Sequence, residues 1–506
     1  MKKVMVPVKT WQGVFRRLLE SFFVVTIAAC FIGCGGGSST GIQTGQNTTV
    51  VLLATSTAND QLTEFYIAIN TVQLIDRAGH AVTLYAYNNQ ASLNDPGSQP
   101  GEFMHLNGTS EPLVIATVPQ GVYTSAVVGT NGCLFSLNRF GPPSPGQPDT
   151  LNTDIYSQGL CGQGTGQTTV NLSSPITVSG NTMALSLNLQ VSQSYTLTGI
   201  GSDAAYTVSP VFSLAPSVIS ASPTNDQNGK ITGLDAQVTS VNANASTFAV
   251  QTIDGVPLSL NSNGNTVFQG ISGAASLGTG NFVNVDFVIQ SGGALLATRV
   301  EIDDPSAVGE LVGPWLAYTA QPDVLVIYPV TCYHLPDTGF CDSVIHFTDT
   351  TAFGVTGQLT NLESLPFTPN FGSSTFLLGA TLSSYSDGDR DSQGAPYLTT
   401  VTLGPQTIDG TITSMSTMNG FSVYTVTLAP YDLIPALQQY ADQALVPPPN
   451  LLSSPNTVTV YADSNTQILT LASIGQGSLL RFRGVIFDDN GAARMDCQEI
   501  LDGVTE

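Results

Sequence analysis

Short apolar runs separated by turn residues recur from residue 49 to about residue 214. The runs have the length of strands, and no helical periodicity links one run to the next. Evenly spaced short strands of this kind are typical of an antiparallel β-sandwich. The sequence therefore predicts an all-β domain over residues 49–214, based on the runs at residues 50–53, 65–69, 72–75, 82–87, 122–128 and 183–191.

Three degenerate copies of one strand pattern follow the first domain. Runs in the same order recur in each copy, for example at residues 265–268, 350–353 and 465–468. A unit of about five or six short strands suits a small closed β-barrel of the OB type. We therefore expect a Pro-, Ser- and Asn-rich linker at residues 215–229, followed by barrel repeats at residues 230–305, 306–406 and 407–506.

The copies differ most between their second and third strands. The first copy has a tight turn at Asp254-Gly255, and the second has a loop at residues 332–341. The third has an insertion near residues 430–456, where apolar residues recur at helical spacing. Loops elaborated on a repeated scaffold are typical of binding modules. Sequence drift at a tolerant site is the alternative.

The N-terminus has the features of an export signal. Five basic residues lie within residues 1–17, and an apolar run at residues 21–33 precedes Cys34. The run is too short to span a bilayer of about 30 Å. It resembles a bacterial lipoprotein signal peptide, and this implies removal of residues 1–33, lipidation of Cys34 and a flexible tether at residues 34–48. Lipidation at Cys30 and an ordinary secretory signal are the alternatives.

Two parts of the chain resemble uncharacterised bacterial domains. The strand runs at residues 50–54 and 65–75, the turn at residues 118–123 and the closing run at residues 206–211 resemble a domain of unknown function that opens many bacterial lipoproteins. This resemblance implies a prealbumin-like β-sandwich and no activity. The three repeats resemble a second uncharacterised domain that occurs beside the first.

Charge excludes some classes of partner. The chain has 13 basic and 36 acidic residues, for a net charge of −23, and −27 without residues 1–33. Phosphate backbones and anionic lipid would repel such a protein, so we expect no nucleic-acid binding and no electrostatic attachment to membranes. Only 10% of the residues are charged whereas 42% are hydrophobic, which indicates a folded chain.

The cysteines indicate an oxidising compartment. Cys133 and Cys161 enclose a Gly- and Pro-rich stretch of the first domain, and Cys332 and Cys341 close the loop of the second repeat. We expect these two pairs to form disulfides. Cys497 is expected to be a buried, unreactive thiol. None of the cysteines has the paired short spacing of a zinc site.

No catalytic motif is present. The four histidines are scattered, and neither a nucleophile elbow nor a His-Glu-x-x-His motif occurs. We therefore expect no enzymatic activity. Paired carboxylates such as Asp303-Asp304 and Asp488-Asp489 leave one alternative, a hydrolase acting on polysaccharide through the second or third repeat.

An acidic loop at residues 386–394 is a candidate calcium site. Asp387, Asp389 and Asp391 alternate in a glycine-containing loop, as in the first half of an EF-hand. The sixth position is Ser392 instead of glycine, and the twelfth, Leu398, provides no carboxylate. The alternative is an enlarged, solvated acidic turn.

Together, these patterns predict a lipid-anchored binding, adhesion or structural module in a bacterial cell envelope. The protein would lie on the periplasmic or cell-surface side of a membrane. Its expected partners are the membrane, through the lipid anchor, and an unknown envelope or extracellular ligand.

Overall fold

The computed structural model describes most of the chain from residue 46 to residue 502. The gaps are residues 58–61, 88–99, 142–151, 161–165, 199–204, 220–229, 243, 245, 319–323, 328–330, 334–343, 358–361, 373–374, 376, 393, 430–431, 436–451 and 471–472. The predicted signal peptide and most of the predicted helical insertion therefore lie outside the described residues.

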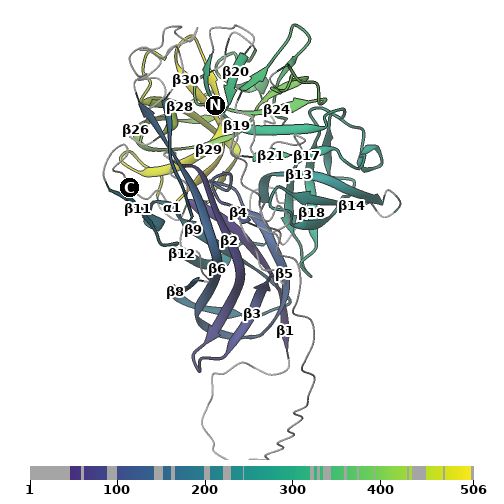
Figure 1. The fold of residues 1–506 in the computed structure, drawn as a ribbon, viewed down its shortest axis with the longest axis vertical. Helices are drawn as coiled ribbons and strands as arrows, with labels where there is room; N and C mark the ends of the chain where they lie inside the picture. The colour runs from purple at the N-terminus through teal and green to yellow at the C-terminus, as the bar shows by residue number, and fades with distance from the viewer. Residues whose placement is uncertain are drawn as a thin grey trace, which may run out of the picture. The chain divides into compact units, whose positions relative to one another are not determined.

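The prediction of an all-β fold is confirmed (Figure 1). In the part of the chain that the structure describes, the helical elements are the short α1 (Val191–Ser194) and two single-turn 3₁₀ helices. Residues 433–435, inside the predicted helical insertion, are also helical. Among the described residues, no helix has the length and hydropathy needed to cross a membrane.

The N-terminal part contains two β-sheets. The first has the strand order β12-β9-β1-β5, formed by Phe212–Ser217, Thr182–Gln190, Asn47–Thr57 and Glu111–Pro119. The second has the path β3-β2-β6-β7, with β4 beside β2 and β8 beside β6; its strands are Ala81–Ala86, Leu62–Asp76, Gly121–Gly141, Asn152–Leu160, Pro100–Glu102 and Gly166–Val178. The sheets are not wholly antiparallel as predicted, because β1 and β9 run parallel. A short ribbon follows, formed by β10 (Tyr195–Thr198) and β11 (Ala205–Val208).

Strand β1 is buried on both faces. Val50 and Leu52 belong to the core of the sandwich, whereas Val51 and Leu53 pack with the core of the first barrel. This is why the run is continuously apolar and does not alternate. The sandwich and the first barrel therefore share a hydrophobic interface along β1.

The first and third repeats have the same strand order. In the first, the order is β15-β14-β13-β17-β18-β16, and a short β15–β18 pairing joins its ends; the strands are Pro257–Asn261, Thr247–Thr252, Lys230–Asn242, Phe282–Ile289, Leu295–Glu301 and Val267–Gln269. The third is the closed barrel β26-β27-β28-β30-β29, formed by Gln406–Met418, Phe421–Leu428, Thr457–Ile468, Ala493–Leu501 and Leu479–Asp488. Strand β28 covers the positions that β15 and β16 share in the first copy.

The second repeat forms a sheet of related order, β22-β20-β19-β24-β25-β23, with β21 beside β19. These strands are Val344–His346, Val324–Ile327, Gly309–Tyr318, Thr381–Ser386, Thr400–Leu403, Ala352–Val355 and Thr331–Tyr333. Its core continues into that of the third barrel, since buried residues such as Trp315 and Phe482 belong to one cluster.

One threonine turn recurs in all three repeats. Thr266, Thr351 and Thr466 each accept a hydrogen bond from the backbone N–H three residues earlier, at 3.0, 2.8 and 2.9 Å. Each hydroxyl also donates to a carbonyl near the end of its own repeat, at 2.7, 2.7 and 2.8 Å. The turn is therefore held against an equivalent late segment in each copy. The accepting carbonyls belong to Ala297, Leu398 and Cys497.

Candidate binding groove

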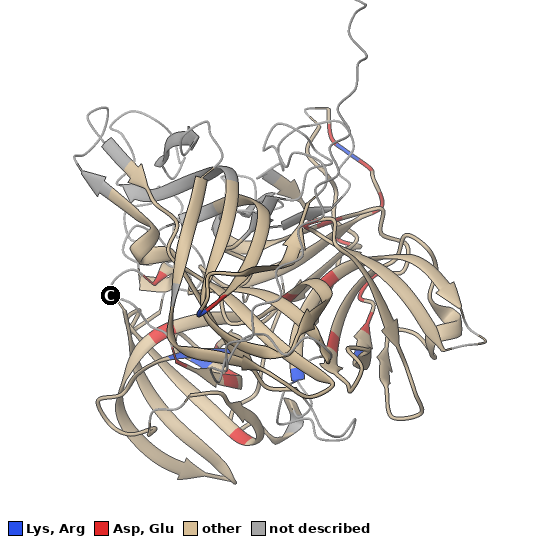
Figure 2. Ribbon diagram, turned by 90° about the horizontal axis from the view of Figure 1, so that it is seen from below, with Lys and Arg blue, Asp and Glu red and all other residues tan. Residues whose placement is uncertain are grey.

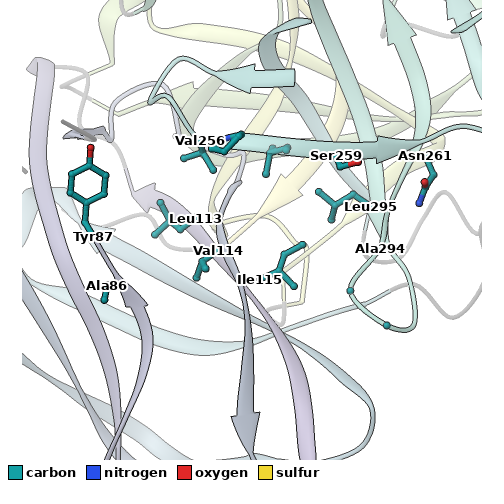
Figure 3. Close-up of a pocket in the computed structure, with 14 residues that line it drawn as sticks. Ala86, Tyr87, Leu113, Val114, Ile115, Val256, Ser259, Asn261, Ala294 and Leu295 are labelled. Carbon is teal, nitrogen blue, oxygen red and sulfur yellow. The ribbon is translucent and has the colours of Figure 1, made fainter. Parts of the chain in front are cut away.

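A groove of about 810 Å³ lies between the sandwich and the first barrel. The sandwich contributes the end of β3 and part of β5, and the barrel contributes β15 and the β17–β18 turn. The lining residues are Ala86, Tyr87, Leu113, Val114, Ile115, Val256, Pro257, Leu258, Ser259, Asn261, Gly292, Gly293, Ala294 and Leu295. Figure 3 shows Tyr87 at one end, Asn261 and Ala294 at the other, and the β5 residues between them.

Strand β5 is an edge strand. It pairs with β1 on one side and is the last strand of its sheet among the described residues. An edge strand leaves one row of backbone N–H and C=O groups available to another chain. Ile115, on β5, keeps 48% of its surface exposed despite its apolar side chain. The groove thus combines a backbone edge with apolar side chains.

The turn Gly292-Gly293 lines the groove on the barrel side and contacts the sandwich. The N–H of Gly292 donates to Thr182 Oγ1 at 2.6 Å, which fixes the turn to the sandwich. Gly293 has a φ of +80°, and a Cβ there would lie 2.7 Å from Thr49 Cγ2 and 3.3 Å from Ile115 Cγ2. Glycine is required at this position both by the backbone conformation and by the close approach.

The groove lining is uncharged. The chain is strongly acidic, yet no Asp, Glu, Lys or Arg is among the lining residues that the structure describes. The polar groups at its ends come from Tyr87, Ser259 and Asn261. Such a site can accommodate an extended segment with alternating apolar side chains, because main-chain hydrogen bonds and side-chain pockets are both present.

A buried polar junction lies where the first barrel meets its neighbours. Arg299 is 5% exposed and binds Asp286 through Nε at 3.0 Å and Glu301 through Nη1 at 2.5 Å. Lys230 Nζ lies 3.3 Å from the same Asp286 carboxylate. Burial alone would raise the pKa of Asp286, but Arg299 and Lys230 lower it to about 2. This cluster is therefore a fully formed ion-pair network.

Glu301 and Asp303, at the end of the first repeat, connect the junction to the second repeat. Glu301 accepts hydrogen bonds from the hydroxyl of Thr356 at 2.9 Å and from the N–H of Gly357. Asp303 accepts from the Tyr385 hydroxyl at 3.0 Å. Burial, followed by repulsion from Glu301, raises the pKa of Asp303 to about 7. This carboxyl group is therefore partly protonated near neutral pH.

The third barrel is linked to both the first barrel and the sandwich. Glu499 accepts a hydrogen bond of 2.6 Å from Thr232 in the first barrel. Arg481 donates to the carbonyl of Ser56 and to Asn107 Oδ1 in the sandwich, both at 3.1 Å. Basic residues are sparse in the molecule (Figure 2), yet four of the eight that follow residue 33 are at this junction, namely Lys230, Arg299, Arg481 and Arg483. We interpret the junction as a structural contact that holds the domains together.

The predicted calcium loop does not gather its three carboxylates. Asp391 is bound to His346 Nε2 at 3.0 Å and to the N–H of Ala395 at 2.8 Å. Asp387 accepts from the N–H of Asp389 at 3.2 Å, and both are exposed. The three are not among the side-chain groups whose ligand atoms lie within 4.8 Å of one another. Calcium binding at this loop stays a prediction that would require the loop to rearrange.

The paired carboxylates of the hydrolase alternative have structural partners. Asp304 accepts hydrogen bonds from Ser306 and from the hydroxyl of Thr399. Asp488 accepts from the N–H of Gly491 at 2.7 Å, and Asp489 binds Arg494 at 2.5 Å. Each of these groups holds a turn or a neighbouring strand.

The predicted lipidation site and both predicted disulfides involve residues outside the described part of the chain, namely Cys34, Cys161 and Cys341. Of Cys133 and Cys332, the structure describes only the backbone, which lies in strands β6 and β21. Cys497 is buried and free. Burial raises the pKa of its thiol well above the usual value, which agrees with an unreactive thiol.

Comparison with known proteins identifies one domain. Residues 235–301, in the first barrel, match a family described as a domain of unknown function (DUF5666). A comparison with curated proteins found no match. Among solved structures, the chain is similar to a copper(II)-bound variant of CusF from Escherichia coli, with 15% identity, coverage of 17% of this chain and 100% of that chain, and a TM-score of 0.13.

Proposed function

We propose that this protein is a non-catalytic, lipid-anchored binding module of a bacterial cell envelope, and that the groove beside β5 binds an extended polypeptide segment. The observation that carries the proposal is the position of an edge strand next to an uncharged groove. A bound segment would pair with β5 as an added strand, while its alternate side chains enter the space between Tyr87 and Leu295.

The charge of the protein supports a polypeptide partner. Nucleic acids and anionic surfaces are repelled by the net charge of −23, whereas an uncharged, apolar segment has no such cost. Binding of the segment would also not remove water from a charged group of the lining, since the polar groups of the lining are hydroxyl, amide and backbone groups. The lipid anchor and the envelope location are supported by the resemblance of residues 1–34 to a lipoprotein signal.

A fluorescent peptide tests the groove. The probe is an eight-residue peptide of alternating valine and threonine, and its control has proline at two central positions. We expect the first peptide to bind and the second not to bind, because proline lacks the N–H that strand pairing requires. Equal binding of both peptides would contradict strand addition.

Two matched variants locate the binding site. Ile115→Arg places a charge on β5, where Ile115 is 48% exposed, and Ile468→Arg makes the same change on β28, where Ile468 is 52% exposed. We expect Ile115→Arg to weaken binding of the valine-threonine peptide at least tenfold and Ile468→Arg to leave it unchanged. Equal effects of the two variants would place binding elsewhere.

A further inference from the structure

Three ionisable side chains from two domains meet near one end of the groove. His105 lies in the turn before β5, Glu111 is the first residue of β5, and Asp254 is in the β14–β15 turn of the first barrel. Their potential ligand atoms all lie within 4.8 Å of one another, and His105 Nε2 is 3.1 Å from Glu111 Oε1. Among the described residues, no other group of three His, Cys, Asp or Glu side chains is so close.

Glu111 has an unsatisfied oxygen in this cluster. The residue is 3% exposed, and its Oε2 atom is buried without a hydrogen-bond partner among the described residues. A buried carboxylate oxygen without a partner is costly, and such atoms in folded proteins usually have a water or an ion beside them. This oxygen is a second observation, besides the clustering, that points to a ligand at this site.

We propose that His105, Glu111 and Asp254 form a binding site for a divalent transition metal, with Zn²⁺ as the expected ion. Imidazole nitrogens and carboxylate oxygens both bind zinc, and three protein ligands leave one coordination position open. Ligands bound to tetrahedral zinc at about 2.0–2.2 Å lie roughly 3.4 Å apart, so the present separations need only small closures. Calcium is disfavoured because it prefers six to eight oxygen ligands.

The position of the site indicates what the metal would do. His105 and Glu111 belong to the sandwich, whereas Asp254 belongs to the first barrel, so a bound ion would link the two domains. Glu111 is two residues before Leu113 and Asp254 two residues before Val256, and both of these line the groove. The metal would therefore stabilise one end of the groove, although the site does not depend on peptide binding.

Calorimetric titration of the purified full-length protein with ZnCl₂, after treatment with a chelator, tests the proposal. We expect about one Zn²⁺ per chain with a dissociation constant below the micromolar range, and a Glu111→Gln variant at least tenfold weaker. His346→Gln is the matched control, because His346 also pairs with a carboxylate, Asp391 at 3.0 Å, outside any such three-residue group. The control should bind Zn²⁺ like the wild type.

The measured Zn²⁺ affinities show whether His105, Glu111 and Asp254 bind the metal. Equal Zn²⁺ affinity of the wild type and Glu111→Gln would overturn it, as would wild-type binding only at millimolar concentration or tight binding of Ca²⁺ in place of Zn²⁺. Circular dichroism of the metal-free variants shows whether they fold. If Glu111→Gln does not fold, Asp254→Asn, in the β14–β15 turn of the other domain, provides the same test by loss of a Zn²⁺-dependent rise in melting temperature.

Discussion

Arg299 and Glu499 occupy equivalent positions in the first and third barrels although their charges are opposite. Arg299 on β18 lies opposite Asp286 on β17, and Glu499 on β30 lies opposite Arg483 on β29. Both strand pairs shift register immediately after this position. The repeats therefore keep a polar cross-strand pair at one place while its polarity is reversed, and both pairs contribute to the buried junction.

Removing Arg299 should be strongly destabilising. An Arg299→Met variant would remove the closest cation from the buried carboxylate of Asp286 and leave Lys230 as its ion-pair partner among the described residues, which should cost about 3–5 kcal/mol. Urea unfolding measures the change. Arg77→Met, at an exposed position of the sandwich, is the control and should change the unfolding free energy by less than about 0.5 kcal/mol. Similar losses in the two variants would contradict the assignment.

Stability should fall as the pH rises from about 4 to above 7. The folded-state pKa of Asp303 is raised to about 7 by burial and by Glu301, so the native state holds a proton that the unfolded state releases near pH 4. Its contribution is complete below the unfolded pKa and is lost as pH rises through the folded pKa. Asp303→Asn should flatten this part of the profile, as measured by thermal unfolding between pH 4 and pH 8. An unchanged slope would show that other groups cause it.

A loss of stability should also occur at strongly acidic pH. The pKa of Asp286 is lowered to about 2 despite its burial, so its contribution is present above pH 4 and is lost as pH falls towards 2. Asp286→Asn should remove this acid-side slope and lower stability at pH 6. Thermal unfolding between pH 2 and pH 6 measures both effects.

Adjacent glycines test the contact between the barrel and the sandwich. Both Gly292 and Gly293 have a positive φ, so alanine at either position should cost about 1–2 kcal/mol through backbone strain. A Cβ at Gly292 meets nothing within 4 Å, whereas one at Gly293 would lie 2.7 Å from Thr49 Cγ2. Gly293→Ala should therefore be less stable than Gly292→Ala by about 1 kcal/mol or more in urea unfolding. Equal stability would mean that the turn does not press on the sandwich.

Peptide mapping under non-reducing conditions tests the cysteine pairs. We expect peptides that join Cys133 to Cys161 and Cys332 to Cys341. Cys497 should react with an alkylating reagent only after unfolding, because its thiol is buried. Any disulfide to Cys497 would show that the predicted pairs are wrong.

Lipidation is tested by labelling with palmitate in a bacterial host. Cys34→Ser should abolish incorporation of the label and leave an uncleaved precursor. Cys30→Ser should have no effect. Labelling of the Cys34→Ser variant would mean that the lipid is attached at Cys30, or that residues 1–34 do not provide the anchor.

Local pattern was sufficient for the strand content and for the order of strands in the repeats. Residues 265–268, 350–353 and 465–468 were aligned by their sequence, and in the structure each run contains a threonine that makes the same two hydrogen bonds. Such features depend on neighbouring residues and on side-chain alternation, which a sequence displays directly.

The sequence alone determined an all-β chain with a strongly acidic composition, because periodicity and charge are properties of residues in order. Only the tertiary structure decided which distant residues meet. His105, Glu111 and Asp254 come from separate segments of two domains, and no spacing in the sequence reveals that they meet. Burial on both faces of β1 and the parallel β1–β9 pairing likewise depend on how the barrel packs against the sandwich. Contacts between domains are set by packing over long sequence separations, and no local pattern encodes them.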